Sequence, residues 1–200
     1  MSERPWDVRL ATWLVAPLVN LPIHPNVLTS IRLVVGLTGA VLFATGSAFN
    51  LAAVFIVVSN FLDHTDGELA RLSGKTSRFG HRYDLACDAM VNAGLFIGLG
   101  LGLRTELGLR SLFFGLSAGI AVAGIFHLRN IIENRHGKTA TRQASWAGFE
   151  IEDVLYLLPL VTLTEQQSTF LTVAAFGAPI ALVIVSAQFL KMGQAKSKAK

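Results

Sequence analysis

The chain has 200 residues, of which 52% are hydrophobic and only 15% are charged, with a net charge of +4 and a positive mean hydropathy. Soluble domains carry about 25% charged residues, and a chain of this length could not bury so much apolar surface, so the composition excludes an ordinary soluble domain and favours a membrane protein. The basic residues stand in short clusters between apolar runs, without a basic stripe, so we expect no nucleic-acid partner.

Residues 5–20 predict an amphipathic helix that lies flat on the membrane surface. Trp6, Leu10, Trp13 and Leu14 fall on one side of such a helix, and tryptophan prefers the headgroup region of a bilayer. The pattern leaves one alternative open, which is a surface helix packed on a protein core.

Six apolar segments follow, each near the ~20 residues that a helix needs to cross the hydrocarbon of a bilayer. Polar or glycine-containing breaks separate them. The fifth segment gives the weakest prediction because it is short and contains Pro159. We expect a single all-α membrane domain over residues 1–200, with the interfacial helix followed by spans at about 26–46, 49–72, 84–103, 110–131, 151–165 and 168–190.

The distribution of basic residues predicts the orientation of these spans. Six spans would place both termini and the loops 73–83 and 132–149 on one side of the membrane. Nearly all of the 17 Lys and Arg residues fall on that side, only Arg104 and Arg110 fall on the other, and Arg32 lies inside the first span. Lys and Arg concentrate on the cytoplasmic side of membrane proteins. We therefore expect a multi-pass integral membrane protein with both termini in the cytoplasm.

Four of the six Asp residues lie close together in the sequence, at positions 63, 66, 84 and 88. Asp63 and Asp66 are three residues apart on the second span, and Asp84 and Asp88 are four apart on the third, so each pair shares one helix face. Both pairs lie near the same end of neighbouring antiparallel helices, and we expect them to converge. Carboxylates at membrane depth are costly and are usually functional.

Converging carboxylates cannot all stay ionised without a cation. Hard oxygen ligands select Mg²⁺ or Mn²⁺, and two such ions would clamp a phosphate group during displacement. Gly67, Ala70 and Gly80 leave room near the carboxylates for a bulky ligand, and a nucleotide fits that space. One or two of these Asp residues could be helix caps or solvated groups, but the full set is hard to explain in that way.

The segment from Asp63 to Asp88 resembles the signature of the CDP-alcohol phosphotransferase (CDP-alcohol phosphatidyltransferase) family, D-x2-D-G-x2-A-R-x8-G-x3-D-x3-D, at every fixed position. The layout of six spans is similar to that of the family, and the segment PNVLTSIR, from Pro25 to Arg32, is similar to the start of the first span in many members. The resemblance implies metal-dependent transfer of a phosphatidyl (phosphoryl-alcohol) group from a CDP-linked donor, most often CDP-diacylglycerol, to a small polar alcohol. CMP would be released, and the larger process would be phospholipid biosynthesis.

The resemblance also implies roles for individual residues. Asp63, Asp66, Asp84 and Asp88 would hold two Mg²⁺ or Mn²⁺ ions, and Asp88 would be the catalytic base that takes the proton of the acceptor hydroxyl. Because relatives pair, a homodimer is implied as well. The donor nucleotide and its phosphates would contact Gly67, Ala70, Arg71, Gly80, Asn26 and Thr29.

The acceptor site is the least defined by the sequence. Arg78, Arg129 and Arg142 are candidates, because two or three Arg residues that meet in a pocket would suit a phosphorylated acceptor. The alternative for each is contact with anionic lipid headgroups. Arg129 is the strongest candidate, because His127 and Asn130 beside it make a polar cluster at the end of an apolar span.

Two other functions remain open from the sequence. Within the same enzyme class, the donor could be a soluble CDP-alcohol and the acceptor a lipid or a polyol phosphate. In a different class, the carboxylates could serve a divalent-cation transporter. A transporter would need acidic groups at the bilayer midplane, often on broken helices, whereas these Asp residues cluster at one membrane face.

Overall fold

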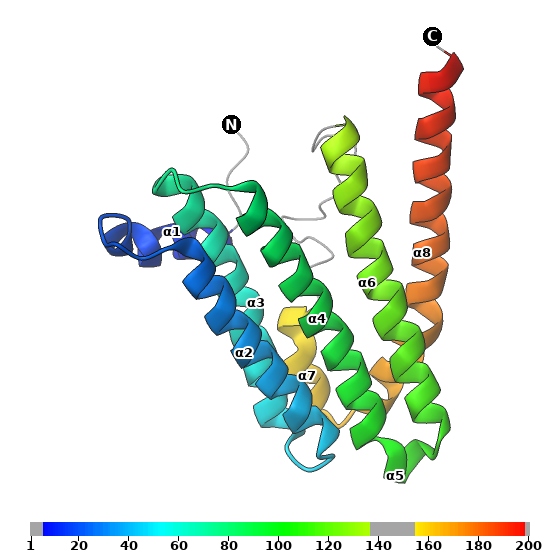
Figure 1. Cartoon of the computed structure of the whole chain (residues 1–200). Coiled ribbons are helices and arrows are strands. Elements are labelled where there is room, and N and C mark those ends of the chain that lie inside the picture. Colours follow the sequence, from blue (N-terminus) through cyan, green and yellow to red (C-terminus); the bar gives the residue numbers. More distant parts are fainter. Residues whose placement is uncertain (1–5, 137–154, 199–200) are drawn as a thin grey trace.

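The computed structural model describes residues 6–136 and 155–198, and all regular structure in these residues is helical. Figure 1 shows how the helices are arranged. In chain order they are α1 Trp6–Val15, η1 Ala16–Leu18, α2 Pro25–Ala44, α3 Phe49–Leu72, α4 Arg78–Gly102, α5 Arg104–Leu107, α6 Arg110–His136, α7 Leu158–Leu163 and α8 Gln167–Lys198.

The long helices form one bundle, in which α2 and α4 run in one direction and α3, α6 and α8 run in the other (Figure 1). α2 packs against both α3 and α4, α4 packs against α6, and α6 packs against α8, while the short α7 packs against α3 (Figure 1). One apolar core runs through the bundle and includes Phe43, Ile56, Leu95, Leu99 and Leu171. α1 lies across one end of the bundle, against α3.

Alternate glycines on α4 set the spacing of three helices. A Cβ atom at Gly98 or Gly102 would collide with backbone carbonyl oxygens of α2, and a Cβ at Gly100 would lie 2.6 Å from the carbonyl oxygen of Ser111 on α6. Small residues let helix backbones approach closely in membranes. The run GLGLGL at 98–103 therefore serves two helix interfaces at once within one chain.

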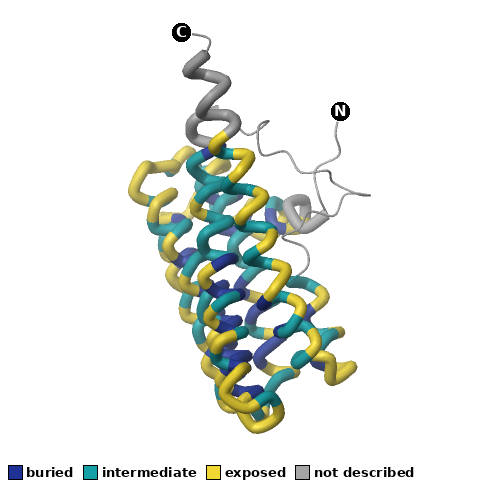
Figure 2. The backbone as a smooth tube through the Cα atoms, turned by 90° about the vertical axis from the view of Figure 1, so that its right-hand side faces the viewer, coloured by how far each residue is buried: buried dark blue, intermediate teal, exposed yellow. Residues whose placement is uncertain are grey.

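Among the described residues, four helices are long and apolar enough to cross a membrane: α2, α4, α6 as far as Ile132, and α8 as far as Leu190. Their outer faces keep large apolar side chains exposed, and Figure 2 shows exposed segments along the length of the bundle. Soluble proteins rarely expose apolar surface on this scale. The protein is thus an integral membrane protein.

The predicted span boundaries agree with the structure at several helices and differ at others. Helices cover the predicted spans 49–72, 110–131 and 168–190. α3 is nevertheless not among the four helices that are apolar enough to cross a membrane, because its second half is polar. The predicted fifth span, 151–165, lies partly outside the described residues, and its described part contains a 3-10 turn at 155–157 and the six-residue helix α7. The count of six spans stays a prediction.

The helix that carries the third predicted span begins earlier than the span itself, which was predicted to start at about residue 84. α4 begins at Arg78, because Ser77 has an extended backbone and its hydroxyl accepts a hydrogen bond from the backbone N–H of Gly80 at 2.9 Å. This is the geometry of a helix N-cap. Gly80 and Asp84 therefore both lie on one rigid helix.

α1 and η1 cover most of the predicted interfacial helix. Ala11 and Val15 are buried against the bundle, whereas Leu10, Trp13 and Leu14 point outward, and 72% of the Trp13 surface is exposed. An outward apolar face at the end of a membrane bundle is what an interfacial helix presents. Its contact with lipid stays a prediction.

Candidate active site

Four carboxylates from two helices converge on one buried arginine. Arg32 of α2 places Nη2 at 3.1 Å from Asp63 and 2.5 Å from Asp84, Nη1 at 2.7 Å from Asp88, and Nε at 3.3 Å from Asp66. Only 2% of the Arg32 surface is exposed. The convergence predicted from the spacing is present, and its centre is a residue to which the sequence analysis gave no role.

Close helix packing brings Arg32 to this position. The hydroxyl of Ser59 on α3 donates a hydrogen bond to the backbone oxygen of Arg32 at 2.8 Å. One turn further along α2, a Cβ atom at Gly36 would lie 2.6 Å from both Ser59 and Val91. The absence of a side chain at Gly36 lets α2 lie close against α3 and α4, so the guanidinium reaches all four carboxylates.

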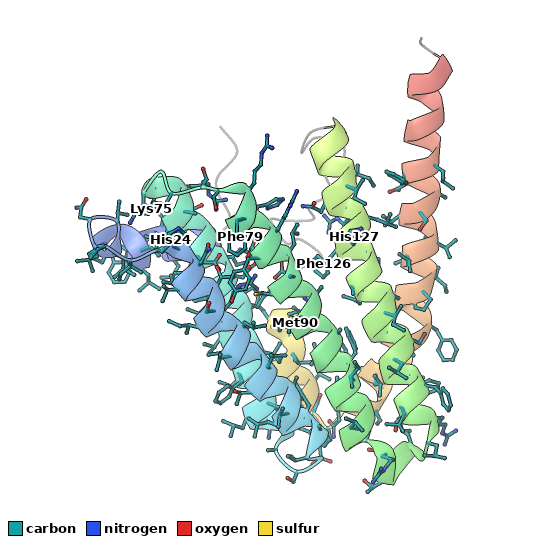
Figure 3. All side chains as sticks on the ribbon, in the orientation of Figure 1. His24, Lys75, Phe79, Met90, Phe126 and His127 are labelled. Atoms are coloured by element: carbon teal, nitrogen blue, oxygen red, sulfur yellow. The ribbon has the colours of Figure 1, made fainter. Side chains whose placement is uncertain are left out.

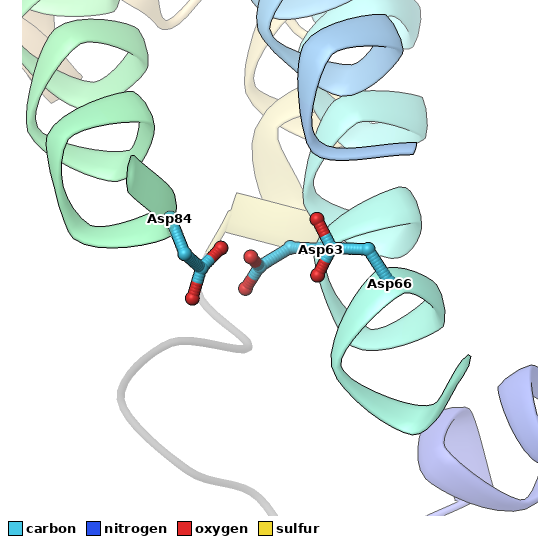
Figure 4. Close-up of side chains that lie close together, drawn as sticks. All are labelled: Asp63, Asp66 and Asp84. Atoms are coloured by element: carbon cyan, nitrogen blue, oxygen red, sulfur yellow. The ribbon is translucent and has the colours of Figure 1, made fainter. Parts of the chain in front are cut away.

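Three of the carboxylates have the arrangement of a metal site. Asp63, Asp66 and Asp84 offer oxygen atoms that all lie within 4.8 Å of one another (Figure 4). Oδ2 of Asp66 is buried and has no hydrogen-bond partner among the described residues, although Arg32 Nε is 3.3 Å away, because the two atoms are not aligned for a hydrogen bond. A buried oxygen with unused lone pairs among other carboxylates fits a hard divalent cation.

Asp88 differs from the other three. It contacts Arg32 but does not belong to the group of mutually close oxygens. Its backbone oxygen accepts a hydrogen bond from the side chain of Asn92 at 2.9 Å. Asp88 therefore lies beside the three mutually close carboxylates. It lines the second of the two cavities that border the carboxylate cluster.

The first cavity lies on the Asp66 and Asp84 side of the cluster and has a volume of about 190 Å³. It opens near the start of α2 and α4, at the end of the bundle where Figure 3 shows Lys75 and His24. All six residues expected to contact the donor nucleotide line it: Asn26, Thr29, Gly67, Ala70, Arg71 and Gly80.

The second cavity lies on the Asp63 and Asp88 side, between α3, α4 and α6, and its volume is also about 190 Å³. Apart from the carboxylates of Asp63 and Asp88, its polar lining consists of three amides, one imidazole and one guanidinium. Phe126, labelled on α6 in Figure 3, adds an aromatic wall. The polar residues other than the carboxylates are Asn60, His81, Asn92, Arg129 and Asn130.

The three residues predicted to contact the acceptor lie in different places. Arg129 lines the second cavity, whereas Arg78 is exposed at the start of α4 and lines neither cavity. Arg142 lies outside the described residues. The arginine pocket predicted for a phosphorylated acceptor thus has one described member.

A second set of contacts connects α1 to the first cavity. The nearly buried carboxylate of Glu68 accepts a hydrogen bond from Arg71 Nη2 at 2.6 Å. The hydroxyl of Thr12 on α1 donates to the other oxygen of Glu68 at 3.4 Å. Glu68 therefore positions the arginine at the wall of the first cavity.

Sequence reasoning missed Arg32 and the residues that complete the second cavity. Asn60 precedes Asp63 by three residues, and Asn92 follows Asp88 by four, so both continue the helix faces that carry the carboxylates. This spacing could have identified them. For Arg32, the signal was a charged residue inside a predicted span, which is usually functional in a membrane protein.

Comparisons with known proteins identify the family of the chain. The sequence profile of the CDP-alcohol phosphatidyltransferase family matches residues 22–190. The chain is 38% identical over 85 residues to the archaetidylinositol phosphate synthase of Pyrococcus horikoshii, which covers 42% of this chain and 45% of that protein. It is 27% identical over 158 residues to the CDP-diacylglycerol–serine O-phosphatidyltransferase of Helicobacter pylori strain J99, which covers 78% of this chain and 63% of that protein. The matches thus span less than two thirds of these relatives.

Solved structures show the same fold. The phosphatidylinositol phosphate synthase of Mycobacterium tuberculosis with CDP-DAG bound superposes with a TM-score of 0.68 at 22% identity, covering 92% of each chain. The same enzyme in complex with manganese and citrate superposes with a TM-score of 0.66 at 21% identity, covering 90% of this chain and 87% of that one. At this identity the likeness concerns the fold alone.

Proposed function

The chain belongs to the CDP-alcohol phosphatidyltransferase family, and we propose that it transfers a phosphatidyl group from CDP-diacylglycerol to a small polar alcohol with release of CMP, as a step of phospholipid biosynthesis. The observation that carries the proposal is the position of the carboxylate cluster between two cavities of different chemistry. A transferase needs such an arrangement, because the acceptor hydroxyl must approach the phosphorus atom of the donor from the side opposite to the departing CMP.

Asp63, Asp66 and Asp84 are the proposed metal ligands, with Asp88 at the edge of a second ion. The mutually close oxygens of the first three and the unpartnered oxygen of Asp66 support this assignment. Bound Mg²⁺ or Mn²⁺ would polarise the phosphoryl group and offset the negative charge on departing CMP. A relative with the same fold is described in complex with manganese.

The first cavity is the proposed donor site. Gly67, Ala70 and Gly80 present little more than backbone toward it, which leaves space for a nucleotide, and Arg71 and Lys75 supply positive charge for a diphosphate. A relative with the same fold is described with CDP-DAG bound, which favours a lipid-linked donor over a soluble CDP-alcohol.

Asp88 is the proposed general base, and the second cavity is the proposed acceptor site. An acceptor hydroxyl in this cavity would give its proton to Asp88 as its oxygen forms the new bond to phosphorus and the bond to CMP breaks. Amide, imidazole and guanidinium groups match the hydroxyls of a small polar alcohol, and Arg129 adds a charge for a phosphorylated one.

We propose further that the end of the bundle that carries the site faces the cytoplasm, together with both termini, and that the protein is a homodimer of single-domain subunits. The basic residues Arg71, Lys75, Arg78, Arg82 and Arg129 belong to the site-bearing end, in keeping with the positive-inside rule. Accessibility of cysteines introduced one at a time at residues 78 and 106, in a variant with Cys87→Ala, tests the orientation when measured in oriented vesicles. Light scattering of the detergent-solubilised protein tests the dimer.

The decisive experiment is CMP release by the purified full-length protein in lipid nanodiscs that contain CDP-diacylglycerol and Mg²⁺ or Mn²⁺. Glycerol 3-phosphate, serine, inositol and inositol phosphate are offered separately. We expect CMP that depends on one acceptor, disappears with a chelator, and falls by at least about 100-fold in Asp88→Asn. Glu106→Gln, an exposed carboxylate at the opposite end, is the matched control and keeps full activity. Folded protein that binds metal but releases no CMP with any acceptor would contradict the proposal.

A further inference from the structure

We propose that Arg32 is a positioning residue that acts as a permanent counter-ion of the four carboxylates, so that the site stays assembled when divalent metal is withdrawn. The inference rests on the proposed metal site. It concerns a residue outside the segment from Asp63 to Asp88, on a helix that contributes none of the four carboxylates.

The shape of the guanidinium group suits this role. Nη2 contacts Asp63 of α3 and Asp84 of α4 together, Nη1 contacts Asp88, and Nε faces Asp66. Nη2 also donates to the backbone oxygen of Asp84 at 3.0 Å. One planar group thus joins α3 to α4 through α2, which the single ammonium of a lysine could not do with the same set of contacts.

The charge of the cluster gives the reason for a counter-ion. Four buried or half-buried carboxylates carry a formal charge of −4, and Arg32 reduces the total to −3. Like charges at these distances repel strongly where water is scarce. Without Arg32, α3 and α4 would separate at this end of the bundle each time the metal dissociated.

The same contacts predict competition with the metal. Arg32 and a divalent ion both use oxygen atoms of Asp63, Asp66 and Asp84. Loss of Arg32 should therefore destabilise the metal-free protein much more than the metal-loaded protein, because divalent ions can replace the missing positive charge. A residue that only fills space in the core would lower the stability of both forms equally.

The test compares thermal unfolding of the full-length protein in nanodiscs with EDTA and with Mn²⁺, while Mn²⁺ binding is followed by electron paramagnetic resonance. The variants are Arg32→Gln and Arg32→Lys. Arg82→Gln is the matched control, because Arg82 is an exposed arginine on α4 close to Asp84 in the sequence. For Arg32→Gln we expect the midpoint in EDTA to fall by about 10 °C and Mn²⁺ to restore more than half of the loss. Arg32→Lys should fall between wild type and Arg32→Gln, and Arg82→Gln should match wild type in both conditions.

The outcomes separate this inference from the proposed function. If Mn²⁺ binds the wild type and Arg32→Gln lowers both midpoints equally, or lowers neither, the counter-ion role is overturned and the metal site stands. If the wild type binds no Mn²⁺, the metal site itself fails, and the inference fails with it. If Arg32→Gln does not yield folded protein, the difference between EDTA and Mn²⁺ is measured on Arg32→Lys, with the same criteria.

Discussion

The two cavities beside the carboxylate cluster have equal volumes but different walls. The first is lined by the starts of α2 and α4 and by the end of α3, where Gly67, Ala70 and Gly80 leave space beside polar and basic side chains, so we expect it to select a ligand by shape and by charge. The second is lined by three Asn side chains, His81 and Arg129 from α3, α4 and α6, together with apolar walls, so we expect it to select a ligand by hydrogen bonding. Shape built from backbone changes little between relatives, whereas side-chain hydrogen bonds change with one substitution.

If the first cavity binds the donor and the second the acceptor, as proposed, this contrast would let one fold keep a common donor and vary its acceptor. The curated relatives that match this chain include a synthase of archaetidylinositol phosphate and a phosphatidyltransferase that acts on serine. Differences in the second cavity suffice for such changes, because a site that hydrogen-bonds a substrate group rejects analogues that lack it. Three substitutions test whether the first cavity binds the donor and the second cavity binds the acceptor.

The largest effect is expected from Gly67→Leu, on the donor side. A Cβ atom at Gly67 would meet only the guanidinium of Arg71, at 3.6 Å or more, so the fold should accept a side chain here while the first cavity is filled. We expect CMP release to fall by about 100-fold with every acceptor, with an unchanged thermal midpoint. Gly67→Ala is the control and should keep most of the activity. If CMP release fell with one acceptor only, the first cavity would not be a donor site that is separate from the acceptor site.

A smaller and more selective effect is expected from Arg129→Gln, on the acceptor side. A hydrogen bond to a charged group contributes about 1.5–3 kcal/mol, so KM for a phosphorylated acceptor should rise about 10- to 100-fold. KM for CDP-diacylglycerol and for a neutral acceptor should change little. Steady-state kinetics with each substrate varied in turn measures this, with Arg78→Gln as control because Arg78 lines neither cavity. Equal changes in donor and acceptor KM would show that the cavities are not separate sites.

The smallest effect is expected from Glu68→Gln. This change weakens the 2.6 Å ion pair that positions Arg71, but Arg71 is about half exposed and keeps its charge. KM for the donor should rise by about two- to fivefold, and the acceptor KM should stay constant. Thr12→Val, which removes only the contact from α1, should change the donor KM less than Glu68→Gln does. A larger effect on the acceptor than on the donor would contradict the assignment of the first cavity.

The lining of the first cavity was predictable from the sequence because one segment of 26 residues carries most of it at fixed helical spacing. Apolar runs likewise gave the bounds of α3 closely. The start of α4 was missed because Ser77 is one serine in a polar stretch, and only its backbone conformation identifies it as a cap. In the second cavity, the sequence indicated Arg129 and Asn130 of α6 but not His81 of α4, because only the packing of α4 on α6 brings His81 beside them.

The alternate glycines of α4 have a consequence for evolution. Gly98 lies 14 residues beyond Asp84 on one unbroken helix, which is about 21 Å along its axis. α4 is held there against α2 on one side and α6 on the other, with no space for even a methyl group at Gly98 or Gly102. A substitution at either position would tilt the whole rod and shift Asp84 and Asp88 at its other end. Natural selection for catalysis should therefore preserve glycine at positions that lie far from the carboxylates, near the opposite end of the bundle.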